Sequence, residues 1–218
     1  MNATIQTRPG FVGRLRSRQS GLPTGLLGRF FGRAMEGNTA EANDRAVAMV
    51  DLSQPRTILD VGFGQGRTAS LLRRGGHRVL GVDASATMVK QATARNRAAC
   101  CDALATLLHG DGITIPFPDE SADAAITAHT IYFMPDPPVT ITDIGRVLRP
   151  GGTLAIACRT SDTPPAAWID PAVYRIPTAA HVVDLLRAAG FDHVEHQPGD
   201  TANSDIHCFA ARIPAGTP

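Results

Sequence analysis

The chain has 218 residues, of which 43% are hydrophobic, enough for one α/β domain with an ordinary buried core. Lys and Arg number 21 against 20 Asp and Glu, so the net charge of +1 gives no general attraction to nucleic acid or anionic lipid. No run of 18 apolar residues occurs, so we expect no stable membrane insertion. A secretory signal is also lacking, and we therefore expect a cytoplasmic protein with a small-molecule partner.

The cysteines and histidines indicate no metal site. They lack the paired spacings of zinc sites and of disulfide frameworks. We expect four ordinary buried thiols, Cys100, Cys101, Cys158 and Cys208.

The first 34 residues are basic and partly apolar, with six arginines and no acidic residue before Glu36. An organelle transit peptide, a membrane-surface helix and a frayed end followed by a helix over the active site all fit this pattern. Lys90 is the only lysine of the chain, so richness in arginine is a general property of this sequence. We therefore favour the third interpretation: a flexible or lid-forming segment at 1–34, before a binding domain at 35–218.

Apolar runs and helical patterns alternate from residue 57 onward, and this alternation predicts a doubly wound, mostly parallel sheet. Glycines or a capping Ser85 separate the first of these segments. We predict strands at 57–61, 79–83, 104–108, 122–128 and 153–157, and helices at 67–74, 85–94, 136–148 and 182–189. Residues 149–152 read as a turn, 160–177 as a long proline-rich loop, and 193–197 with 206–212 as a closing strand pair.

A glycine-rich turn follows the first predicted strand directly. Gly62, Gly64 and Gly66 allow the chain to turn sharply and a ligand to approach the backbone. A dinucleotide fingerprint places its third glycine one position later, where this chain has Arg67. The pattern therefore favours another adenosine-bearing cofactor.

Carboxylates follow the next two strands. Asp83 ends the second strand, where a carboxylate can bind both ribose hydroxyls; its simpler role is to cap the next helix. Asp111 follows the third strand and can accept a hydrogen bond from an adenine amino group, although alone it is more often a turn residue.

With these motifs the sequence resembles the class I S-adenosylmethionine-dependent methyltransferases, especially the small bacterial branch akin to ubiquinone/menaquinone-biosynthesis and phosphatidylethanolamine methyltransferases. The similar segments are Leu59–Gly66, Gly81–Asp83, Asp111 with Ile115–Asp119, His129–Phe133 and Val147–Gly152. The resemblance implies a Rossmann-like, three-layer α/β/α fold with seven strands, the last of them reversed. It also implies S-adenosylmethionine as cofactor.

The resemblance further implies the positions of the cofactor-binding residues. Asp60 and the glycine turn would hold the methionine part, Asp83 the ribose and Asp111 the adenine edge. The full expected set is Asp60, Gly62, Phe63, Gly64, Gly66, Asp83, Ala84, Met88, Asp111, Gly112 and His129. A lid would include Met35, Asn38 and Asn43.

His129 and Tyr132 are the candidate catalytic residues. A histidine can take a proton from a hydroxyl acceptor, or it can simply shape the pocket, and both roles stay open. Tyr132 either contacts the acceptor or packs in the core, and both roles stay open. Trp168 and Tyr174 either form an aromatic wall or anchor their loop.

The expected function is methyl transfer to an oxygen or nitrogen atom of a small or lipid-like acceptor, by a monomer or homodimer. An aminopropyl transferase on the same fold is one alternative, although the carboxylates expected for a polyamine chain are not evident around His129. A non-catalytic adenosine-ligand module is the other.

Overall fold

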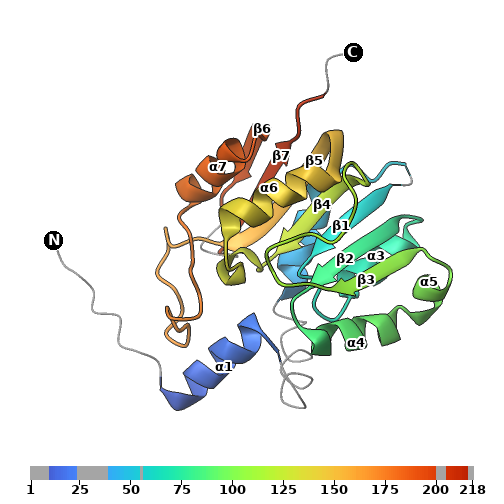
Figure 1. Ribbon diagram of the computed structural model, residues 1–218. Helices are drawn as coiled ribbons and strands as arrows, with labels where there is room; N and C mark the ends of the chain where they lie inside the picture. Colours follow the sequence, from blue (N-terminus) through green and yellow to red (C-terminus); the bar gives the residue numbers. More distant parts are fainter. Residues whose placement is uncertain (1–9, 24–38, 55, 200–204, 216–218) are drawn as a thin grey trace.

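In a computed structural model, the structure describes residues 10–23, 39–54, 56–199 and 205–215. They form a seven-stranded sheet between helices (Figure 1). The strands are β1 (Thr57–Val61), β2 (Arg78–Asp83), β3 (Ala105–His109), β4 (Ala122–Ala128), β5 (Leu148–Arg159), β6 (Asp192–Gln197) and β7 (Ile206–Arg212). The helices are α1 (Phe11–Gly21), residues 39–48, α3 (Arg67–Arg74), α4 (Ala86–Arg95), α5 (Arg97–Cys101), the 3₁₀ turn η1 (Ile131–Phe133), α6 (Pro137–Val147) and α7 (Ala179–Ala188).

The strand order is β3-β2-β1-β4-β5-β7-β6, and β7 is the strand that runs antiparallel to its neighbours. This confirms the predicted Rossmann-like sheet with a reversed final strand. The order reverses at β1, which pairs in parallel with β2 on one side and β4 on the other. In such sheets ligands bind beyond the carboxyl ends of the strands at the reversal point.

Alternate residues of the central strands face two separate hydrophobic layers. Ile58 and Val79 pack with α3 and the 39–48 helix, whereas Leu59 and Leu80 face the layer that contains α6 and α7. Figure 1 shows α6 and α7 over one face of the sheet. Because both faces of the sheet are covered, the central strands are continuous apolar runs, and such runs can be recognised in the sequence.

Two predicted boundaries differ from the structure by more than two residues. Residues 149–152, expected as a turn, belong to β5: its pairing with β4 passes from Ala122 opposite Leu148 to Ala124 opposite Thr153, so β5 bulges there. Helix α7 begins at Ala179 instead of 182, because the Thr178 hydroxyl accepts a hydrogen bond from the His181 amide at 3.1 Å.

The cysteines also differ from expectation. Cys158 and Cys208 are buried, but Cys101 is exposed and Cys100 partly so, because both end the short helix α5. Within the described ranges, no three His, Cys, Asp or Glu side chains are grouped to share a metal ion. The helices of these same ranges include none with the length and apolar character needed to cross a membrane.

Candidate active site

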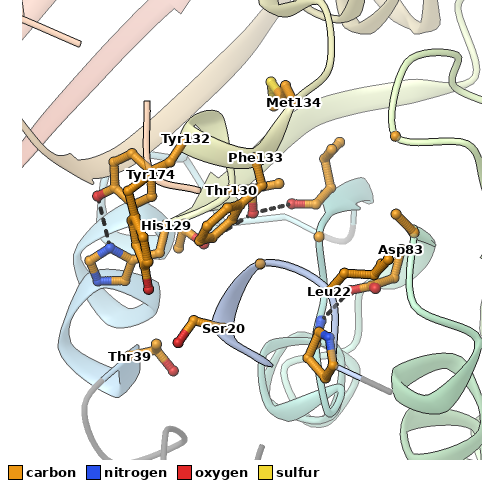
Figure 2. A pocket seen from close by; sticks show the side chains of 18 of the residues that line it. Ser20, Leu22, Thr39, Asp83, His129, Thr130, Tyr132, Phe133, Met134 and Tyr174 are labelled. Carbon is orange, nitrogen blue, oxygen red and sulfur yellow. Dashed lines mark hydrogen bonds between the residues drawn. The ribbon is translucent and has the colours of Figure 1, made fainter. Parts of the chain in front are cut away.

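One continuous cavity of about 1750 Å³ lies at the carboxyl ends of β1, β2, β3 and β4. Its walls include the glycine turn after β1, α1 and the loop between β5 and α7. Figure 2 shows two groups of labelled side chains facing this space, Asp83 with Leu22 at one end and His129 with Tyr132 and Tyr174 at the other.

The glycine turn is held by close packing on both sides. Gly62 has φ +74°, and a Cβ there would lie 2.3 Å from the Thr130 hydroxyl oxygen. Gly66 has φ +73°, and a Cβ would lie 2.7 Å from the Asn96 amide nitrogen, which donates to the Gly66 carbonyl. Only glycine satisfies both the backbone and the space, so the turn exposes its backbone to the cavity.

Asp83 leaves β2 with its carboxylate turned toward the glycine turn. Its two oxygens accept hydrogen bonds from the Gly64 amide at 2.9 Å and the Ser85 amide at 2.8 Å. Burial raises the pKa of Asp83 to about 6, although both amide bonds act in the opposite direction. The cap of α4 is the Ser85 side chain, not Asp83, so the simpler role considered for Asp83 does not apply.

Asp60 lies in β1, one residue before its end, and is 4% exposed. One of its carboxylate oxygens has no hydrogen-bond partner among the residues that the structure describes. Burial, and the charge of Asp83, raise the pKa of Asp60 to about 7. A buried carboxyl without a partner is costly, and a cation or N–H donor bound nearby would remove that cost.

The adenine edge expected from the sequence also faces the cavity. Ala84, Met88, Asp111 and Gly112 all line it. The Asp111 carboxylate, however, accepts bonds from the Ile113 and Thr114 amides and the Thr114 hydroxyl, at 2.7–2.9 Å. Asp111 therefore shapes its own turn, the simpler of its two roles, while it borders the cavity.

At the other end of the cavity, His129 follows β4 in the left-handed backbone region, with φ +57°. This conformation is uncommon outside glycine and is often found at functional sites. The His129 Nδ1 atom lies 3.0 Å from the Tyr132 hydroxyl, which also accepts a hydrogen bond from the Arg159 amide. Burial, and the positive charge of Arg159, lower the pKa of His129 from 6.5 to about 4.

Aromatic side chains form a wall next to His129. Phe133 and Tyr174 have ring centroids 4.7 Å apart, and Trp168 meets Tyr174 edge to face at 5.8 Å. The Arg16 guanidinium of α1 lies 3.9 Å from the centre of the Trp168 ring. Arg16, Phe133, Trp168 and Tyr174 line the cavity together with His129. Trp168 and Tyr174 therefore form an aromatic wall, and their packing also anchors the loop that contains them.

Helix α1 is fixed to this wall by one buried hydroxyl. The Ser17 hydroxyl donates to the Trp168 carbonyl at 3.1 Å and accepts from the Asp170 amide at 3.0 Å. The chain after α1 reaches the other end of the cavity, where the Ser85 hydroxyl donates to the Pro23 carbonyl at 2.5 Å. The segment from Arg16 to Pro23 therefore borders both ends.

A methyltransferase domain family matches residues 59–156, the part of the chain that contains the glycine turn and the strands β1 to β4. The 27-O-demethylrifamycin SV methyltransferase of Amycolatopsis mediterranei is 32% identical over 56% of this chain and 45% of its own length. The O-methyltransferase resE of Aspergillus sclerotiorum is 26% identical over 88% of this chain and 80% of its own. The chain thus spans about half the length of the first of these relatives.

The solved structures agree in fold. A methyltransferase from Aquifex aeolicus that depends on S-adenosylmethionine superposes with a TM-score of 0.61, at 22% identity, over 78% of this chain and 87% of that one. Residues 59–156 thus match a methyltransferase domain family, and the fold around them is that of class I S-adenosylmethionine-dependent methyltransferases. The cofactor of the domain is S-adenosylmethionine.

The residues of this methyltransferase domain fit that cofactor. The partnerless oxygen of Asp60 suits a cationic group, and Asp83 presents a carboxylate where the resemblance expects ribose hydroxyls. The turn leaves open space at Gly64, where a Cβ would lie more than 4 Å from any neighbouring side chain or backbone of the described ranges. These features allow a ligand to approach the backbone closely.

Most expected residues of the methyltransferase site come together, with two exceptions. Asp60, in β1, and Gly66, at the end of the glycine turn, are not among the residues that line the cavity. Met35 and Asn38 lie outside the described residues, whereas Asn43 is a lining residue.

The sequence assigned no role to several residues that line the cavity, among them Thr130, His109, Arg159 and Leu22. His109 lies 3.1 Å from the Ala84 carbonyl through its Nε2 atom, and Thr130 packs on Gly62. No sequence signal marks Leu22 or Arg159, because α1 and β5 meet the cavity only in the folded chain.

Proposed function

We propose that the chain transfers the methyl group of S-adenosylmethionine to an oxygen or nitrogen atom of a small-molecule or lipid-like acceptor. The observation that carries this proposal is that one cavity joins the glycine turn and Asp83 to His129 and the aromatic wall. Such a cavity accommodates cofactor and acceptor together, with the acceptor on apolar and aromatic side chains. By its name, the Aspergillus sclerotiorum relative is an O-methyltransferase, and the Amycolatopsis mediterranei relative methylates an O-demethylated compound.

The proposed mechanism needs alignment more than acid or base chemistry. When bound, S-adenosylmethionine supplies a methyl group already activated by a positive sulfur. Asp83 would bind the ribose hydroxyls, and Asp60 would balance the positive charge of the methionine part. His129 and Phe133 would position the acceptor, and exclusion of water would preserve the alignment.

We further propose that α1 belongs to a lid, as expected for the segment 1–34. Ser17 fixes α1 to the aromatic wall, and Pro23 contacts Ser85 beside the adenosine end. These contacts close the cavity from the side away from the sheet and support water exclusion during transfer. A cytoplasmic location and a monomeric or homodimeric state remain predictions.

Calorimetry with S-adenosylmethionine and with S-adenosylhomocysteine tests the donor half of the proposal. A methyl-release assay over hydroxylated and amino acceptors then tests the transfer. Absence of cofactor binding would refute the proposal. Binding without turnover on any acceptor favours the non-catalytic module, and turnover only with the decarboxylated cofactor favours an aminopropyl transferase.

A further inference from the structure

The hydrogen bonds of Tyr132 determine which ring nitrogen of His129 carries the proton. The Tyr132 hydroxyl accepts a hydrogen bond from the Arg159 amide and lies 3.0 Å from His129 Nδ1. Within the described part of the chain, the structure gives this hydroxyl no third partner. If the hydroxyl donates to Nδ1, every group of the triplet is satisfied.

The opposite arrangement would leave the phenolic proton without an acceptor. Tyr132 is 2% exposed, so water does not replace the missing bond. An unsatisfied buried donor costs roughly 1–3 kcal/mol, enough to decide between two tautomers of similar intrinsic energy. His129 therefore has an unprotonated Nδ1 and a protonated Nε2.

Nε2–H is a hydrogen-bond donor, and the surroundings of His129 keep the ring neutral. Burial and Arg159 on β5 lower its pKa to about 4, whereas Asp205 before β7 and Glu41 of the 39–48 helix act weakly in the opposite sense. The deep burial of Tyr132 raises the pKa of its hydroxyl well above the usual value, so it stays a donor. A ring of this kind is a poor base for an ordinary alcohol or phenol.

An oxygen atom can use such a donor during methyl transfer, whereas an amine cannot. A neutral amine has a single lone pair, and a hydrogen bond from Nε2–H would occupy the pair that must attack carbon. An ionised oxygen has three lone pairs, so one attacks while another accepts from Nε2–H. Arg159 exerts the largest of the three charge effects on His129, but its guanidinium is paired with Asp205 at 2.9 Å, and Glu41 also lines the cavity. The preference for an ionised oxygen therefore rests on the Nε2–H donor and its geometry.

We propose that the acceptor is an acidic hydroxyl on an apolar ring system, already ionised when it enters, and that His129 donates a hydrogen bond to it instead of removing its proton. This inference rests on the proposed methyl transfer. A lone pair of the oxygen forms the new C–O bond as the C–S bond breaks, and the bonding pair returns to sulfur. The hydroxyl has lost its proton to solvent beforehand, so no base in the site is needed.

Nuclear magnetic resonance of the full chain with ¹⁵N-labelled histidine tests the tautomer without cofactor or acceptor. The His129 signals are assigned by their loss in His129→Gln. We expect the Nδ1 resonance at a position typical of an unprotonated ring nitrogen and the Nε2 resonance at a protonated one. In Tyr132→Phe, which removes the donor to Nδ1, the two tautomers should mix. A protonated Nδ1 in the unmodified protein would overturn the inference.

The acceptor class is tested by calorimetry on protein loaded with S-adenosylhomocysteine. The probes are 2-hydroxy-1,4-naphthoquinone, whose hydroxyl is ionised at pH 7, and 2-naphthol, whose hydroxyl is not. We expect the ionised probe to bind at least about tenfold more tightly, from a charge-assisted hydrogen bond. His129→Gln, which keeps an N–H donor, should retain this preference, and His129→Leu should lose it.

Equal signals for the two probes, including none for either, would overturn the inference. Failure of the proposed function gives a different result, because then S-adenosylhomocysteine itself does not bind. Circular dichroism spectra that match the spectrum of the original protein show that both His129 variants are folded, and S-adenosylhomocysteine is added at a concentration that saturates each variant.

Discussion

Asp60→Asn should stabilise the free protein at neutral pH while it weakens cofactor binding. The pKa of the buried Asp60 is raised from 3.8 to about 7. Between these two values the folded protein retains a proton that the unfolded chain has lost, so stability falls as pH rises and then levels off above pH 7. At about 1.4 kcal/mol per pKa unit, the loss reaches at most about 4 kcal/mol. Asparagine has the same shape and no charge, so the variant lacks this loss.

Urea unfolding between pH 4 and pH 8 measures the effect. The variant and the original protein should agree within about 1 kcal/mol at pH 4, and the variant should gain up to about 4 kcal/mol by pH 8. Its affinity for S-adenosylmethionine should fall about tenfold, from loss of the negative charge that would balance the positive methionine part. Asp184→Asn on the exposed side of α7 is the control, and its pH dependence should follow that of the original protein. A stability difference for Asp60→Asn that does not change with pH would refute the reasoning.

Three further substitutions test the glycine turn, the ribose carboxylate and the lid. Gly62→Ala places a Cβ 2.3 Å from Thr130, so the free energy of unfolding in urea should fall by about 2–4 kcal/mol. The control is Gly151→Ala, where φ is +76° and the described residues leave the space around a Cβ open, so the loss should be only about 1–2 kcal/mol. Equal losses would contradict the packing argument. Asp83→Asn replaces a carboxylate oxygen that accepts a hydrogen bond from a backbone amide, so calorimetry should show about tenfold to hundredfold weaker cofactor binding. Unchanged affinity would exclude Asp83 from the site. Ser17→Ala removes two hydrogen bonds of a fully buried hydroxyl, so amide hydrogen exchange in α1 should become about tenfold faster while exchange in β1 is unaffected. Unchanged exchange in α1 would show that this hydroxyl does not hold the helix.

The amino-acid sequence predicted the sheet, and it also predicted most of the residues that the structure brings together at one end of the cavity. Both depend on short segments in which neighbouring residues act together: apolar runs that must be buried on two faces, and glycines that turn the chain directly after a strand. Asp83 follows from the same local logic, because the carboxyl end of a parallel strand points at the ligand. The reversed strand β7 came from the family resemblance, and the pairing with β5 and β6 confirms it.

The local exceptions depend on contacts that form in the folded chain. The hydroxyl of Thr178 starts α7 early, and residues 149–152 belong to β5 because β4 pairs with β5 on both sides of the bulge. The sequence around Asp111 is typical of a turn, and the hydrogen bonds that its carboxylate accepts from the next residues show that it forms one.

The acceptor end of the cavity also required the tertiary structure. His129 could be identified as a candidate from its place after β4, but its protonation depends on a hydroxyl three residues away and on an amide from β5. Helix α1 reaches the aromatic wall through Ser17 and Trp168, residues more than a hundred positions apart. Such contacts between distant segments leave no periodic pattern in the sequence, because each depends on two surfaces that meet only after the sheet has formed.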